Sequence, residues 1–159
     1  MKALFCIPHF FEGLPEGEVR YGSQRAAKKQ SKIQALSRCL NQLLLLFDAA
    51  HLGANHRLRI FELIKNECAS KVDIVVLTVL EKHLLNDIST PKHLFRHLVV
   101  DIDPTHLGYA AHKQLLEASG NYDFYGYMED DIIIHDPHFF EKITYFNDTI
   151  SQTDPRGLL

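Results

Sequence analysis

The sequence contains no tryptophan, and cysteine is scarce, with three residues among 159. These cysteines, Cys6, Cys39 and Cys68, stand far apart and form no CxxC pair. This spacing supports neither a disulfide framework nor a structural zinc site. We therefore expect reduced thiols, and with them a cytoplasmic location.

Long apolar runs are also missing. The longest, LLLLF, is far shorter than the roughly 20 apolar residues that a membrane-spanning helix needs. The N-terminal MKALFCIPHF has no small-residue cleavage site, so it is more typical of a first strand than of a signal peptide. We expect no transmembrane segment.

Charge of one sign does not dominate, because the formal net charge is −3. A chain of this balance gives no electrostatic reason to expect nucleic-acid binding. Three phosphate or nucleophile motifs are absent as well: the P-loop, the GxGxxG dinucleotide fingerprint and the GxSxG elbow. The classes of nucleotide-binding protein and hydrolase that depend on these motifs lose their support.

Apolar and β-branched runs alternate along the chain with stretches of helical periodicity. Strands are predicted at 2–7, 72–80, 94–102 and 122–128, and helices at 24–49, 106–118 and 138–148. Around Leu58, Phe61 and Ile64 we expect a further helix or an irregular excursion. The alternation predicts an α/β domain with a Rossmann-like, mostly parallel sheet flanked by helices. Ligands of such sheets bind beyond the carboxyl ends of the strands.

Three consecutive acidic residues, Glu129, Asp130 and Asp131, follow the strand predicted at 122–128. In extended backbone Glu129 and Asp131 point to one side and Asp130 to the other. Clustered carboxylates suit Mg²⁺, which takes one or two of them and completes its shell with water and phosphates. The other interpretation is a solvated strand end. Because apolar runs flank the cluster, and unpaired charges are expensive there, we favour a metal-linked or phosphate-linked role.

The segment YDFYGYMEDDIIIHDPHFF resembles the central segment of GT-A-type glycosyltransferases, where a strand delivers the acidic DXD motif. The preceding HLGYAAHKQLLEASGNYDF is similar to that family's helix of pattern G-x-x-x-A-R-N. The resemblance implies the nucleotide-sugar-binding half of a metal-dependent glycosyltransferase. Its donor would be a UDP-sugar or GDP-sugar, its cofactor Mn²⁺ or Mg²⁺, and its acceptor is open.

The resemblance also implies roles for individual residues. Asp131 would bind the metal, and Glu129 and Asp130 would contact the nucleotide sugar. Lys113 would contact phosphate or base. The loop after the first strand would reach the base and diphosphate, which makes candidates of Arg20, Tyr21, Ser23 and Arg25.

Two further features complete the expectations. His9 ends the first strand, where it could contact a ligand or pack as a strand-end side chain. The basic stretch RAAKKQSK opens the long helix, and either an anion bound there or plain solvent exposure accounts for it.

We expect residues 1–159 to form a single α/β nucleotide-sugar-binding domain that is cut before an acceptor-binding half. The catalytic base would lie in that missing half, so the fragment could be inactive by itself. Two alternatives stay open. One is a non-catalytic α/β module that binds a nucleotide or a partner, and the other is a Mg²⁺-dependent phosphoryl-transfer domain.

Overall fold

The computed structural model describes residues 1–15, 24–47, 52–63 and 71–153. Its centre is a four-stranded, fully parallel sheet with the strand order β5-β4-β1-β6. The strands are β1 (Lys2–Pro8), β4 (Lys71–Val79), β5 (Arg96–Val100) and β6 (Phe124–Tyr127). The predicted α/β class with a parallel sheet flanked by helices is confirmed.

The two central strands, β1 and β4, carry most of the core. Pairing runs in register from Lys2 opposite Lys71 to Pro8 opposite Leu77. Both strands are buried almost throughout, because both faces of the sheet are covered. This burial explains why their sequences are continuous apolar runs, with no alternation of polar and apolar residues.

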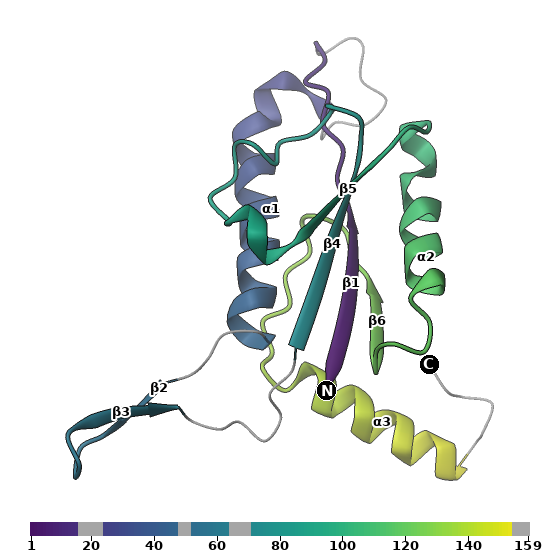
Figure 1. Cartoon of the computed structure of the whole chain (residues 1–159). Coiled ribbons are helices and arrows are strands. Elements are labelled where there is room, and N and C mark those ends of the chain that lie inside the picture. Colours follow the sequence, from purple (N-terminus) through teal and green to yellow (C-terminus); the bar gives the residue numbers. More distant parts are fainter. Residues whose placement is uncertain (16–23, 48–51, 64–70, 154–159) are drawn as a thin grey trace.

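Helices α1 (Lys29–Phe47) and α2 (Leu107–Glu117) cover opposite faces of the sheet (Figure 1). Leu36, Leu40 and Leu43 of α1 pack on one face of β1, and Leu107 and Ala111 of α2 pack on the other. The chain passes from β1 through α1 to β4, whereas it passes from β5 through α2 to β6 on the far side of β1. The direction of winding therefore reverses between β1 and β6, and such a switch point is where open α/β sheets bind ligands.

Helix α3 (Phe139–Thr153) lies across the amino-terminal end of the sheet (Figure 1). Phe140 anchors it, with ring contacts to Phe5, Phe47 and Phe124 at centroid distances of 6.2, 4.7 and 4.9 Å. The Asp136 carboxylate accepts the His138 N–H at 2.9 Å just before the helix, as a helix-capping side chain does.

The excursion expected around Leu58 is an antiparallel hairpin of β2 (Leu52–Asn55) and β3 (Ile60–Leu63), so the helical alternative was wrong. The Asn55 side chain accepts the Leu58 N–H at 3.2 Å, a turn-forming bond that competes with helix. Arg59 then takes a positive φ of 53°. Ile64 lies outside the described residues.

Within the described helices, none has the length and apolar character to cross a membrane.

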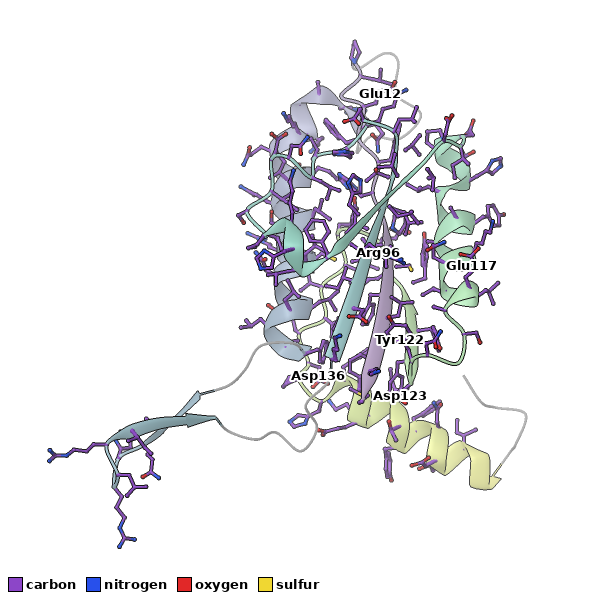
Figure 2. All side chains as sticks on the ribbon, viewed as in Figure 1. Glu12, Arg96, Glu117, Tyr122, Asp123 and Asp136 are labelled. Carbon is purple, nitrogen blue, oxygen red and sulfur yellow. The ribbon has the colours of Figure 1, made fainter. Side chains whose placement is uncertain are left out.

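Different charged side chains lie at the two ends of the sheet (Figure 2). Asp123 and Asp136 lie at the end where the strands begin, and Glu12 lies at the opposite end. Asp123 accepts the backbone N–H of Lys2 at 2.7 Å, which ties β6 to the start of β1. The acidic triplet follows β6 and therefore lies at the carboxyl end, as predicted.

Candidate functional site

A cavity of about 700 Å³ opens at the carboxyl ends of β1 and β6, at the switch point of the sheet. This volume is within the range of small-molecule sites. Five segments form its walls: the chain after β1, the chain leading into α1 with its first turn, the turn after β4, the chain leading into α2 with its first turn, and the chain at the end of β6. The side chains that carry chemistry there are Glu12, Gln24, Lys32, Lys82, Asp103, Thr105, Tyr127, Glu129 and Asp130.

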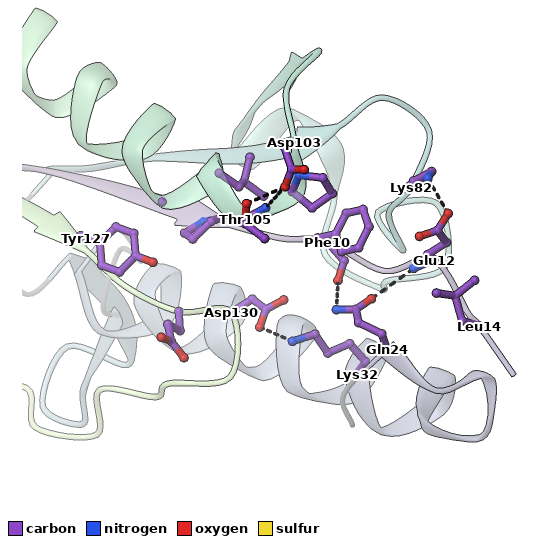
Figure 3. A pocket seen from close by; sticks show the side chains of 15 residues that line it. Phe10, Glu12, Leu14, Gln24, Lys32, Lys82, Asp103, Thr105, Tyr127 and Asp130 are labelled. Carbon is purple, nitrogen blue, oxygen red and sulfur yellow. Dashed lines mark hydrogen bonds and ion pairs between the residues drawn. The ribbon is translucent and has the colours of Figure 1, made fainter. Parts of the chain in front are cut away.

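Gln24 fixes the chain that follows β1 (Figure 3). Its amide nitrogen donates to the Phe10 carbonyl at 2.9 Å, and its amide oxygen accepts the Glu12 N–H at 3.2 Å. The Lys82 ammonium group pairs with the Glu12 carboxylate, which ties the same segment to the turn after β4. One wall of the cavity is therefore held by hydrogen bonds from two other segments.

The three residues of the acidic triplet differ in their exposure to solvent. Asp130 is only 5% exposed, whereas Glu129 and Asp131 are exposed. The Asp130 carboxylate receives two partners: His9 Nδ1 lies 2.5 Å from Oδ2, and Lys32 Nζ lies 2.6 Å from Oδ1. The repulsion that Asp130 would otherwise meet is therefore offset inside the protein, by a histidine and a lysine.

The orientation of His9 is fixed from both sides. The Leu84 N–H donates to His9 Nε2 at 3.1 Å, so Nε2 is an acceptor and the ring proton stands on Nδ1, where it donates to Asp130. Burial alone would raise the pKa of Asp130, but the hydrogen bond from His9 and the charge of Lys32 outweigh burial and hold that pKa below its usual value. Asp130 is thus an ionised, internally paired carboxylate. His9 is fully buried and is a packed strand-end residue.

Glu129 and Asp131 are the two carboxylates of the triplet that stay available to a ligand. Glu129 lines the cavity, whereas Asp131 is exposed beyond its lining. Within the part of the chain that is described, no three His, Cys, Asp or Glu side chains gather as a metal-binding group. Two carboxylates do match what Mg²⁺ takes from a protein when substrate phosphates and water complete its shell. Such a cation would need further oxygens from a ligand, and of these two carboxylates Glu129 is the one that lines the cavity.

The start of α2 forms the wall opposite the triplet. It is preceded by the 3₁₀ turn η4 (Pro104–His106), which Asp103 caps by accepting the Thr105 N–H at 2.8 Å. Gly108 lets the Tyr127 hydroxyl approach, because a Cβ on Gly108 would lie 3.3 Å from that oxygen. Burial, followed by the charges of Glu129 and Asp130, raises the pKa of Tyr127. Tyr127 therefore faces the cavity as a neutral hydroxyl.

Two of the remaining predicted residues, Lys113 and Arg25, do not line the cavity. Lys113 is exposed on α2, where its nearest acidic partner is Glu117 at 3.8 Å. Arg25 lies beside Leu14 at the start of the 3₁₀ turn η2 (Ala26–Lys28) and is not among the residues that line the cavity. Arg20, Tyr21 and Ser23 lie outside the described residues.

Sequence reasoning did not single out Lys32 within the basic stretch RAAKKQSK, and it missed Gln24 and Tyr127. A signal for Lys32 was present, since it stands four residues before the buried Leu36 and so shares the inward face of α1. Gln24 and Tyr127 carried no comparable signal. Hydrogen bonds to Phe10 and Glu12 hold the Gln24 side chain, and the Tyr127 ring packs against His112 of α2 at a centroid distance of 5.0 Å.

No family model, no curated protein and no solved structure matches this chain. The residues around the cavity and their chemistry are therefore what indicates a function.

Proposed function

We propose that the chain is the donor-binding half of a GT-A-type glycosyltransferase and that it binds a nucleotide sugar together with Mn²⁺ or Mg²⁺ in this cavity. The observation that carries the proposal is the position of the acidic segment. Glu129 follows the carboxyl end of β6, at the switch point, and lines the same cavity as the first turn of α2. That is the crevice where open α/β sheets bind nucleotides.

The charge of the cavity supports the need for a cation. Among the described lining residues, four carboxylates (Glu12, Asp103, Glu129 and Asp130) stand against the two lysines Lys32 and Lys82. A diphosphate brings further negative charge into a site that already has an excess of two. A divalent cation offsets both, so the nucleotide and the metal should bind together.

The chain's own residues would have separate roles in this function. Glu129 and Asp131 would hold the cation, and Asp130 would anchor the segment that carries them through its bonds to His9 and Lys32. The cation would neutralise the charge that develops on the departing diphosphate. The acceptor and the group that activates it are not part of this proposal.

A thermal-shift experiment tests the proposal. The chain is heated with UDP or GDP alone, with Mn²⁺ alone, and with both together. At a ligand concentration about 100-fold above Kd, we expect a rise in Tm of about 5–10 °C, and only with the combination. Asp131→Ala should abolish the rise, whereas Glu117→Ala, which removes an exposed carboxylate on α2, should keep it. The proposal fails if no nucleoside diphosphate shifts Tm in the presence of Mn²⁺ or Mg²⁺.

A non-catalytic binding module is the second candidate. The observation in its favour is that one carboxylate of the triplet, Asp130, has both of its oxygens engaged within the protein. Incubation with UDP-sugars or GDP-sugars and Mn²⁺ separates the two candidates. Slow release of the nucleoside diphosphate to water supports the enzyme, whereas binding of the nucleotide that needs no divalent cation supports the module.

A further inference from the structure

We propose that Lys32 is the phosphate-binding residue of this cavity and that Asp130 and His9 are positioning residues, which hold the Lys32 ammonium group at the cavity wall. This inference rests on the proposed function, because it assumes that the ligand carries a diphosphate. It gives Asp130 a different role from the nucleotide-sugar contact that the family resemblance implies.

Lys32 is the lysine of the basic stretch at the start of α1 that reaches the cavity. Its side chain is 15% exposed, whereas that of Lys29 is 54% exposed and pairs with Asp87 away from the cavity, at 2.9 Å. An ammonium group has three N–H donors. Among the described residues, Asp130 Oδ1 is the partner of Lys32, so two donors stay available to a ligand in the cavity.

Asp130 holds Lys32 in place because Asp130 is itself held. Its second oxygen accepts from His9, which is fully buried and is fixed by the Leu84 N–H at 3.1 Å. Three chain segments therefore converge on this one carboxylate: the end of β1, helix α1 and the turn after β6. An ammonium group held in this way is preorganised, so little side-chain entropy is lost when it binds an anion.

The second lysine of the cavity is less suited to this role. The Lys82 side chain is 44% exposed, and its partner Glu12 is 31% exposed, so water competes for both. The Lys32–Asp130 pair is drier, at 15% and 6% exposure. A charge–phosphate contact is stronger where water is excluded, which favours Lys32.

A purely structural role for the pair is the competing explanation, and a buried ion pair by itself is weak evidence for either role. The two explanations differ in what happens when both charges are removed together. Lys32→Met with Asp130→Asn leaves no unpaired buried charge, so its stability should stay close to that of the wild type. If Lys32 binds phosphate, the double variant still loses affinity.

The experiment measures two quantities for each variant: Kd by calorimetry in the presence of Mn²⁺, and the midpoint of urea unfolding. The probes are UDP, GDP and inorganic pyrophosphate. We expect Lys32→Met and the double variant to weaken binding by about 10- to 100-fold, as for the loss of one charge-assisted hydrogen bond. Lys32→Arg should stay within a few fold, and Lys28→Met, an exposed lysine of η2, is the matched control.

The outcomes separate this inference from the proposed function. A double variant that binds nucleoside diphosphate as tightly as the wild type overturns the role of Lys32 and leaves the proposed function standing. Binding of pyrophosphate but of neither nucleotide, again lost in the double variant, supports Lys32 and overturns the proposed function. If the wild type binds none of the three probes, both proposals fall.

Discussion

Substitution by alanine should have different effects at the two adjacent carboxylates Asp130 and Asp131: a loss of stability at the first and a loss of ligand binding at the second. Asp130→Ala removes the acceptor of a fully buried His9 N–H and the counter-ion of Lys32. Asp131→Ala removes an exposed carboxylate with no described partner of this kind. The first variant should therefore lose stability, and the second should lose only ligand binding.

The structure sets the size of the first effect. Breaking a buried ion pair costs about 3–5 kcal/mol, because a charge is left without its partner. Lys32 is 15% exposed and can turn toward water, so the lower end, about 3 kcal/mol, applies. The unsatisfied His9 N–H is a large part of this cost, since a buried donor without a partner costs about 1–3 kcal/mol. Asp131→Ala should change the free energy of unfolding by less than about 0.5 kcal/mol.

Urea unfolding followed by far-ultraviolet circular dichroism measures both variants. With an m-value of about 2 kcal/mol per molar urea, Asp130→Ala should lower the midpoint by about 1–2 M. Asp131→Ala should leave the midpoint in place while abolishing the Mn²⁺-dependent rise in Tm with UDP or GDP. Equal midpoints for the two variants would refute the assignment of Asp130 to an internal network.

Three further predictions concern the packing of the core and the pH dependence of stability. Gly126→Ala should cost about 1–3 kcal/mol, because the new Cβ would lie 2.5 Å from Cδ1 of Phe5; a wild-type midpoint in urea would contradict this contact. Phe140→Ala should cost about 3–5 kcal/mol if α3 is integral to the core, and a change below 1 kcal/mol would mean that the helix docks weakly. His97 is exposed overall, but partial desolvation of its ring lowers its pKa, so the unfolded chain binds the proton more readily and stability should fall slightly as pH drops through about 6.5. His97→Gln should flatten that decline in midpoints measured from pH 7.5 to 5.5, and an unchanged slope would exclude His97 as its source.

The fold could be predicted from the sequence because short residue patterns indicate most of its strands and helices. The β-branched run of β4 and the helical spacing of Leu36, Leu40 and Leu43 are each determined within a few residues. The β2–β3 hairpin was the exception. Its short apolar run fits either period, and the turn at Asn55 and Arg59 decides the matter.

The candidate site was predicted only in part. The sequence placed Glu129, Asp130 and Asp131 at the carboxyl end of a strand and indicated that the middle residue points away from its neighbours. It could not show that Asp130 turns toward His9 and Lys32, which are 121 and 98 residues away along the chain. The family resemblance singled out Lys113, which lies on the exposed side of α2, whereas Lys32 was one residue of the basic stretch RAAKKQSK and lines the cavity.

The sequence by itself therefore determined the α/β class, most of the elements and the end of the sheet at which the carboxylates gather. These properties depend on residue periodicity, which is local. Only the tertiary structure decided which carboxylate is paired inside the protein and which two are exposed. The reason is physical: the charge state and availability of Asp130 depend on burial and on donors from distant segments, and packing alone brings those donors together.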